Sequence, residues 1–271
     1  MIFLTGYEAP SKNQGFLIKN GHVMKKIYLI VLSLCLMNLI SWTPPSSARE
    51  VIYGIDAKFP PFVYLRNGIP SGFDVEVIKA IFEGKDIDLV FKIMPWDNVL
   101  KALADGSIHI TSGVDKTFER LKIYDFALFP LVSDDVRIFV KEEKGINGLN
   151  DLKGKNVSTL KGASYQSLLE NTGDINIHLF NSETDALKVL NNSTVEAFVG
   201  TVKPARFNIK IYGYRDMKEV GTPIFKSTMY LAVRKGDKEL LELINRGQQE
   251  IINNGVYEKI YRKWFIEERY F

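Results

Sequence analysis

An aspartate, Asp56, stands immediately after a run of apolar and β-branched residues at 51–55. The run predicts a buried strand, and the consecutive prolines at 60 and 61 prevent its ladder from continuing. Asp56 is therefore expected at the carboxyl end of a strand, with the aromatic ring of Phe59 close by. Because ligands of open α/β sheets bind beyond the carboxyl ends of the strands, these residues predict a small-molecule cleft.

The elements expected to position this cleft alternate between strands and helices after residue 49. Short apolar runs predict strands at 51–55, 87–93, 107–111, 136–140, 155–159, 176–180, 196–200 and 229–233. Asp74 and Asp97 are each expected to cap a helix, Ser182 begins a capping-box sequence, and residues 237–253 predict a longer amphipathic helix. This alternation predicts an α/β fold with mainly parallel sheets.

Composition and charge narrow the class of protein. The 271 residues allow at most two modest domains, and the apolar and charged fractions of 46% and 25% are typical of globular proteins. The net charge of +3 comes from residues 1–48, which hold four lysines against one glutamate, whereas the remainder is balanced. A balanced chain offers no basic face, so we expect no nucleic-acid partner.

Residue types needed for metal or nucleophilic chemistry are scarce. After residue 48 the histidines are His109 and His178, which lie in two different predicted strands. A zinc site needs more ligands than these, so both are interpreted as structural. The chain also lacks a glycine-rich nucleotide loop and a Gly-x-Ser-x-Gly sequence. We therefore expect no metal, no cofactor and no catalytic triad.

Residues 24–48 are typical of a cleaved secretory signal. A basic start at Met24 precedes an apolar run at 27–40, and small residues at 46–48 suit signal peptidase. The run is short for a membrane span, although an uncleaved anchor is the alternative. Residues 1–23 are interpreted as a misannotated upstream extension. The single cysteine, Cys35, lies in the signal, where Leu34 is too large for a lipidation motif, so a periplasmic protein without lipid anchor or disulfide is expected.

Several short motifs occur in a fixed order along the rest of the chain. They are Gly54-x-Asp56-x-x-Phe59-Pro60-Pro61-Phe62, Gly72-Phe73-Asp74-Val75-Glu76, Trp96-Asp97, Thr117-x-x-Arg120, Tyr124-Asp125-Phe126, Asp151-Leu152-Lys153-Gly154-Lys155, Gly255-Val256-Tyr257 and Lys259-Ile260-Tyr261-x-Lys263-Trp264-Phe265. Each motif is weak alone, but the ordered set resembles the bacterial family 3 extracellular solute-binding proteins, the receptors of polar amino-acid ABC importers. The resemblance covers nearly all of residues 50–265.

The resemblance implies a two-lobed periplasmic-binding-protein fold that closes around its ligand. Each lobe would be a mainly parallel sheet flanked by helices, and two crossing strands would join the lobes. By this analogy, residues 49–132 and 227–271 form lobe 1, and residues 133–226 form lobe 2. The implied partners are a small-molecule ligand, either an amino acid or a small carboxylate, and an ABC permease in the inner membrane. We expect the protein itself to be a monomer.

The family pattern also assigns candidate ligand-binding residues in lobe 1. Arg120 matches the arginine that grips the ligand's α-carboxylate, for which a guanidinium offers a two-pronged fork. Ser112 and the backbone of Gly113 and Val114 would donate to the same group. Asp56 matches a position that meets the ligand's far or cationic end, although a turn aspartate is the alternative. Phe59 and Trp96 match the aromatic positions around the ligand's side chain, with core packing as their alternative.

Two positions depart from the family pattern. Asp115 stands where the family usually has serine or threonine, and Thr201 stands where it usually has the aspartate that pairs with the α-ammonium. Because an unpaired buried ammonium is costly, either Asp115 binds it or the ligand is not a standard α-amino acid. Asp115 could also neutralise Arg120 within the protein and so prevent carboxylate binding. Ser164 follows Gly162-Ala163 at the turn that normally donates to the carboxylate. Lys161 is an extra cation there, which could balance Asp115, recognise an acidic ligand or simply be solvated.

Two further functions remain open from the sequence. A binding module of this kind could report ligand occupancy to a separate membrane partner instead of serving transport. A cyclohexadienyl dehydratase also resembles this family, and such an enzyme needs a general acid in the cleft. Asp56, Asp115 and Lys161 are the candidates for that acid, and none is compelling. We therefore expect a binding protein and not an enzyme.

Overall fold

The structure is a computed structural model that describes residues 26, 29, 48–141 and 145–267. By its internal contacts the chain divides into Met1–Ser47 and Ala48–Phe271, and the second unit is described below. The predicted upstream extension, most of the predicted signal and Cys35 lie outside the described residues. Within the part of the chain that is described, no helix is long and apolar enough to cross a membrane.

One continuous sheet of nine strands forms the centre of the second unit. Its strands are β1 (Arg49–Ile55), β5 (Ile87–Ile93), β6 (Ile110–Asp115), β7 (Tyr124–Phe126), β8 (Val132–Val140), β9 (Asn156–Leu160), β10 (Asn176–Phe180), β11 (Ala197–Thr201) and β12 (Lys218–Arg234). They follow the order β10-β9-β11-β8-β12-β6-β1-β5, with β7 paired to β12. Each predicted strand overlaps an observed one, but the strand predicted at 107–111 begins later, at Ile110.

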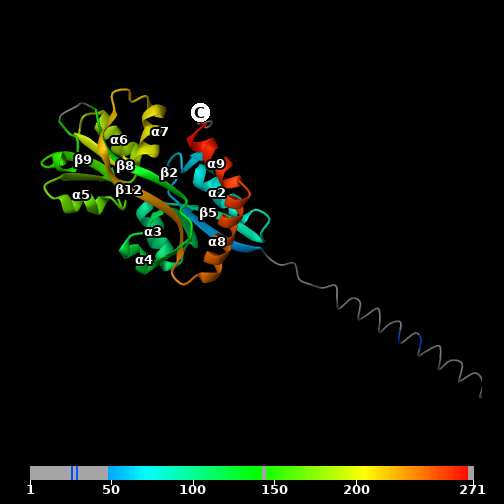
Figure 1. Cartoon of the computed structure of the whole chain (residues 1–271). Helices are drawn as coiled ribbons and strands as arrows, with labels where there is room; N and C mark the ends of the chain where they lie inside the picture. Colours follow the sequence, from blue (N-terminus) through cyan, green and yellow to red (C-terminus); the bar gives the residue numbers. More distant parts are fainter. Residues whose placement is uncertain (1–25, 27–28, 30–47, 142–144, 268–271) are drawn as a thin grey trace, which may run out of the picture. The chain divides into compact units, whose positions relative to one another are not determined.

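Helices and one small antiparallel sheet surround this central sheet (Figure 1). The helices are α2 (Phe73–Phe82), α3 (Trp96–Asp105), α4 (Phe118–Ile123), α5 (Gln166–Thr172), α6 (Glu183–Asn191), α7 (Val202–Tyr212), α8 (Lys238–Asn253) and α9 (Val256–Phe265), with a 3-10 turn, η1 (Leu149–Leu152). The small sheet consists of β2 (Lys58–Phe59), β3 (Val63–Arg66) and β4 (Ile69–Ser71). It supplies the chain reversal that the consecutive prolines predicted.

Parallel pairing occurs on both sides of two long antiparallel strands. β1 pairs in parallel with β5 and β6, and β9 pairs in parallel with β10 and β11. Between these groups, β8 and β12 run antiparallel to each other from Val132 opposite Met229 to Val136 opposite Phe225. These strands correspond to the crossing strands that the family resemblance implied, and the expected α/β arrangement with mainly parallel sheets is confirmed.

The buried apolar side chains form separate clusters on the two sides of the crossing strands. Side chains of β1, α2, α8 and α9 share one cluster, and α3 adds a second cluster beside β6. The remaining clusters draw on β8, β9, β11, α6 and α7. Following the division that the resemblance implies, residues 49–132 and 227–271 are called lobe 1 and residues 133–226 are called lobe 2. Figure 1 shows α8 and α9 beside α2, where they cover lobe 1.

The starts of two helices differ from the prediction. Gly72, not Asp74, is the N-cap of α2, with a φ of 128° that brings its backbone close to Phe62. A Cβ on Gly72 would lie 2.1 Å from the Phe62 carbonyl oxygen, so this position requires glycine. Pro95, not Asp97, is the N-cap of α3. Both aspartates lie instead in the first turn of their helix, where the helix dipole favours negative charge.

The other predicted helix boundaries hold. The Ser182 hydroxyl accepts the backbone N–H of Asp185 at the start of α6, at 3.1 Å. Gly106 ends α3 in the left-handed conformation. The helix predicted at 237–253 is α8, which ends at Asn253, and the following Asn254 and Gly255 separate it from α9.

Candidate ligand-binding site

The strand ends of lobe 1 bring the predicted residues to one edge of the sheet. Asp56 follows β1, Trp96 begins α3 after β5, and Ser112, Gly113 and Asp115 lie in the last part of β6. Because β1, β5 and β6 are parallel, their carboxyl ends meet at the same edge. Two adjacent cavities open there, and Phe59, Trp96, Gly113 and Leu160 line both of them.

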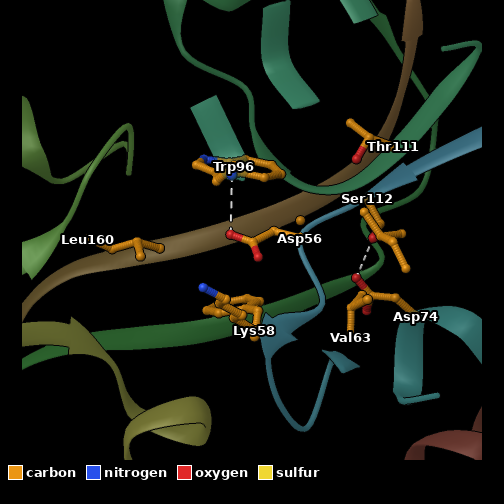
Figure 2. A pocket seen from close by; sticks show the side chains of 11 residues that line it. Asp56, Lys58, Val63, Asp74, Trp96, Thr111, Ser112 and Leu160 are labelled. Atoms are coloured by element: carbon orange, nitrogen blue, oxygen red, sulfur yellow. Dashed lines mark hydrogen bonds between the residues drawn. The ribbon is translucent and has the colours of Figure 1, made fainter. Parts of the chain in front are cut away.

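The central cavity lies between the lobes and contains about 330 Å³ of free space, its opening to solvent included. Its lining residues are Phe59, Trp96, Gly113, Asp115, Arg120, Leu160, Ala163, Ser164, Tyr165, Thr201, Ser227 and Met229. The distal cavity contains about 470 Å³ of free space on the same basis. It is lined by Ile55, Asp56, Lys58, Phe59, Val63, Asp74, Trp96, Thr111, Ser112, Gly113 and Leu160 (Figure 2). Among the predicted site residues, Lys161 and Val114 line neither cavity, and the others line one or both.

Arg120 faces lobe 2 from α4. The Thr117 hydroxyl accepts the Arg120 backbone N–H at 3.2 Å and so fixes the first turn of this helix. Nη2 of Arg120 donates to the Gly162 carbonyl oxygen at 2.9 Å, and Nη1 donates to the Asp115 carbonyl oxygen at 3.4 Å. Burial lowers the pKa of Arg120 from its ordinary value. These bonds use part of a group with five N–H donors, so donors remain for a ligand.

The Gly162 carbonyl also accepts a bond from Trp96. The indole Nε1 of Trp96 lies 3.3 Å from this oxygen. Trp96 and Arg120, both from lobe 1, therefore donate to the same carbonyl group of lobe 2. Gly162 has a φ of +76°, and a Cβ there would lie 3.3 Å from Cδ1 of Trp96. Glycine therefore suits both the left-handed backbone and the close approach of the indole.

Asp115 is buried among hydroxyl groups. Its Oδ1 accepts the Ser227 hydroxyl at 2.8 Å, and its Oδ2 accepts the Ser164 hydroxyl. The first partner lies on β12, and the second lies in lobe 2. The carboxylate thus faces the central cavity between the lobes. Within the described part of the chain it forms no hydrogen bond or salt bridge with the guanidinium of Arg120 or with Lys161, although its charge opposes the lowering of the Arg120 pKa by burial.

Lys161 occupies a different place from the remaining predicted residues. Its Nζ lies 2.9 Å from Oδ2 of Asp97, so it pairs with the first turn of α3. The proposed pairing of Lys161 with Asp115 does not occur in this structure, because the Lys161 side chain extends toward α3. Lys161 also does not line either cavity among the described residues.

Thr201 contacts an acid that the sequence analysis missed. Its hydroxyl donates to Oε1 of Glu183 at 3.1 Å. Glu183 is 1% exposed, and its Oε2 has no hydrogen-bond partner among the described residues. Burial raises the pKa of Glu183 to about 8. Sequence inspection places Glu183 in the first turn of a capped helix, where acids are common, so its burial carried no separate signal.

Two carboxylates line the distal cavity. Asp56 accepts the backbone N–H of Trp96 at 3.2 Å, and the Ser112 hydroxyl donates to Oδ2 of Asp74 (Figure 2). Burial raises the pKa of Asp56 to about 6, although Lys58 opposes this shift, and burial raises the pKa of Asp74 to about 7. Oδ1 of Asp74 has no partner among the described residues. The sequence analysis assigned Asp74 to a helix cap and therefore missed its place in the cavity.

The aromatic residue Phe59 both packs in the core and lines the site. Its ring stacks on Phe62 with ring centroids 5.2 Å apart, and it lines both cavities. The histidines, by contrast, serve local structure. His109 accepts the Ile52 backbone N–H at 2.9 Å, and His178 lies 3.1 Å from the Asn156 side chain. Within the described ranges, no group of three acidic, histidine or cysteine side chains is placed to hold a metal.

The fold and the cleft between its lobes are those of a bilobal solute-binding protein. Residues 51–267 match the family described as bacterial extracellular solute-binding proteins, family 3, and the chain belongs to this family. The resemblance inferred from the ordered motifs is therefore confirmed.

Relatives and solved structures agree with this assignment. The chain is 30% identical over 234 residues to a probable histidine-binding protein of Neisseria gonorrhoeae, covering 83% of this chain and 87% of the relative. It is 27% identical over 266 residues to the arginine-binding extracellular protein ArtP of Bacillus subtilis, covering 91% and 100%. An ancestral arginine-binding protein bound to arginine has a TM-score of 0.75 at 33% identity, covering 81% and 99%. A histidine kinase sensor domain has a TM-score of 0.77 at 27% identity, covering 81% and 97%.

Proposed function

We propose that the protein binds an α-amino acid with a cationic side chain in the periplasm and presents it to an ABC importer. The observation that carries this proposal is a pair of carboxylates in the distal cavity, the buried Asp74 and the half-buried Asp56. Arg120 lines only the central cavity. The central cavity thus offers the cation Arg120 to a ligand carboxylate, and the distal cavity offers Asp56 and Asp74 to a ligand cation.

The main-chain end of the ligand would bind in the central cavity. Donors of Arg120 that are not used within the protein would hold the α-carboxylate, with help from the backbone N–H of Gly113, which lines the same cavity. A Cβ on Gly113 would meet nothing within 4 Å, so a ligand can approach this backbone closely. Asp115 would accept the α-ammonium, because a carboxylate accepts more bonds than its two serine partners supply.

The side chain of the ligand would extend into the distal cavity between Phe59 and Trp96. The flat faces of these rings suit a guanidinium or imidazolium group. A cation near Asp56 and Asp74 would compensate the burial that raises the pKa of each acid. Binding should therefore release protons at neutral pH. Lys58 stands beside Asp56 as a competing cation, and its side chain is exposed.

The relatives support a cationic amino acid and an exported receptor. ArtP is described as an extracellular arginine-binding protein, and the Neisseria relative as a probable histidine-binding protein. An arginine-binding protein of Escherichia coli, 27% identical over 249 residues, is described as part of an ABC transporter. These names support both the ligand class and the proposed permease partner.

A calorimetric and thermal-shift panel tests the proposal. The panel contains L-arginine, L-lysine, L-histidine, L-glutamine and L-glutamate at millimolar concentration. We expect the cationic members to raise the melting temperature, since a ligand at one hundred times its Kd adds about 2.7 kcal/mol. Asp56→Asn and Asp74→Asn should each weaken L-arginine binding, and Asp88→Asn, an exposed position on β5, is the matched control. Equal shifts with all five amino acids, or shifts with none, would contradict a cationic ligand.

A sensory role is the second candidate function. The similarity to a histidine kinase sensor domain at 27% identity favours it, because the same closing motion can report occupancy to a membrane partner. Capture by a co-expressed permease would favour transport, and capture by a membrane kinase would favour sensing. The relatives named above are described as binding proteins, and we propose no catalysis. Incubation with prephenate or arogenate should therefore leave both compounds unchanged.

A further inference from the structure

A buried acid, Glu183, lies directly behind Thr201, the position where the family pattern leads one to expect an aspartate. Thr201 is the last residue of β11 and the N-cap of α7, and it lies at the wall of the central cavity. Its hydroxyl donates to Glu183, which lies in the first turn of α6. Both residues are almost fully buried, with Glu183 at 1% and Thr201 at 2% exposure. Glu183 itself does not line the cavity among the described residues. A threonine at the cavity wall thus separates a buried carboxyl group from the ligand space.

We infer that Glu183 is a positioning residue for the ligand's α-ammonium, which it recognises through the hydroxyl of Thr201. The inference rests on the proposed function, since it requires a ligand that carries an ammonium group. A hydroxyl has one hydrogen and two lone pairs. When Glu183 takes the hydrogen, the lone pairs of Thr201 become acceptors for a cationic donor. The negative charge behind the hydroxyl strengthens this acceptor.

The ammonium would then be held from both lobes. Asp115 lines the central cavity from lobe 1, and Thr201 lines it from lobe 2. An ammonium has three N–H donors, so it can bond to both residues at once. Asp115 and Thr201 can face the same cavity only when the two lobes are closed. Recognition of the ammonium is therefore coupled to closure of the lobes.

The groups around Glu183 do not stabilise its ionised form before the ligand binds. Asp134 of β8 raises the pKa of Glu183, and Tyr165, at the start of α5, adds no positive charge. Lys203 of α7 is bonded to Asp134 at 3.1 Å. With its pKa raised to about 8, Glu183 holds a proton at neutral pH. An ammonium at Thr201 would favour the carboxylate, so the proton passes from Glu183 to solvent when the ligand binds.

The pH dependence of binding separates this role from a purely structural one. L-arginine is the probe, and 5-guanidinopentanoate, which lacks the α-amine, is the matched ligand. We measure the Kd of both by calorimetry below the raised pKa of Glu183, about 8. Release of one proton should strengthen binding by up to about tenfold per pH unit. Asp56 and Asp74 contribute equally to the pH dependence of Kd for both ligands, because both ligands carry the guanidinium group. Any difference between the two pH slopes therefore comes from the α-ammonium.

Glu183→Gln should remove this difference between the ligands, because glutamine keeps the shape but cannot lose a proton. Thr201→Val should weaken the binding of L-arginine and leave the binding of 5-guanidinopentanoate nearly unchanged. It also serves as the second variant if Glu183→Gln fails to fold. Glu170→Gln, at an exposed position on α5, is the control and should behave like the wild type.

The outcomes distinguish this inference from the proposed function. Wild-type protein that binds neither compound would overturn the proposed function and this inference with it. Wild-type protein that binds L-arginine with the same pH slope as 5-guanidinopentanoate would overturn this inference alone. An unchanged slope in Glu183→Gln, or in Thr201→Val where the first variant does not fold, would also overturn it alone. A slope difference that disappears in these variants, with unchanged Glu170→Gln behaviour, would support it.

Discussion

The Nζ of Lys161 lies 2.9 Å from Oδ2 of Asp97, so a salt bridge joins lobe 2 to lobe 1 beside the cleft. The bond from Lys161 lowers the pKa of Asp97, so Asp97 is ionised at neutral pH. The neighbouring residues extend this contact, since Gly162 accepts bonds from both Trp96 and Arg120. Closure of the lobes therefore depends on direct bonds between them as well as on any ligand.

Lys161→Ala should speed ligand release without damaging the fold. The lysine side chain is 49% exposed, and an exposed ion pair contributes at most about 1 kcal/mol. We therefore expect the dissociation rate of L-arginine to rise by roughly fivefold or less at low salt, with less effect at high salt. Stopped-flow fluorescence measures this rate. Lys153→Ala, at an exposed site in the same lobe, should not change the dissociation rate. A comparable rise of that rate in Lys153→Ala would show that the salt bridge of Lys161 is not responsible.

Arg120→Ala should abolish most binding while leaving the protein folded. Arg120 lies in the central cavity with donors still available, and loss of a charged bond in a desolvated site costs roughly 2–5 kcal/mol. Arg120→Lys should recover only part of the affinity, because an ammonium cannot form a two-pronged contact with a carboxylate. Calorimetry with L-arginine measures the loss, and circular dichroism checks the fold. Wild-type affinity in Arg120→Ala would show that the carboxylate binds elsewhere.

The unfolding free energy should fall as the pH rises toward 8. Burial raises the pKa of Glu183 from 4.5 to about 8 and the pKa of Asp74 from 3.8 to about 7. Between the ordinary and raised values, the folded protein holds protons that the unfolded chain has released. Their stabilising effect is complete below the ordinary values and is lost as the pH rises through the raised values.

Urea denaturation of the unliganded protein at a series of pH values measures this decline. Each proton contributes a slope of at most about 1.4 kcal/mol per pH unit. Glu183→Gln should reduce the slope from about pH 4.5 to pH 8 and should remove most of it between pH 7 and pH 8, where Asp74 has already titrated. Glu170→Gln should follow the wild type. A wild-type curve that is flat or rising over this range would refute the assignment of buried protonated carboxyl groups.

Sequence reasoning anticipated the site where it depended on strand ends and failed where it depended on side-chain direction. Asp56, Ser112 and Asp115 lie together at one edge of the sheet, since parallel strands bring their carboxyl ends together. The direction of Lys161 toward α3 could not be read from its position after β9. Nor could the burial of Glu183, because an acid in a first helical turn looks the same whether it faces solvent or the interior of the lobe.

The pair Asp115 and Thr201 gives the last prediction. Asp115→Thr replaces the carboxylate with a hydroxyl and removes the proposed ammonium acceptor of lobe 1. We expect L-arginine affinity to fall by more than about tenfold, whereas 5-guanidinopentanoate should be affected much less. A loss of one charged hydrogen bond of this kind costs about 1.5–3 kcal/mol. Equal affinity of Asp115→Thr and wild type for L-arginine would exclude Asp115 as the acceptor.

Thr201→Asp added to Asp115→Thr should then restore part of the affinity from lobe 2. The new carboxylate would lie beside Glu183, which holds a proton at neutral pH because burial raises its pKa to about 8. Two adjacent acids share one proton readily, so Glu183 would donate to the new aspartate and keep its proton when L-arginine binds. The double variant should therefore bind L-arginine with a weaker pH dependence than the wild type. Calorimetry over the same pH series measures both effects, and a double variant no better than Asp115→Thr would mean that the ammonium does not reach Thr201.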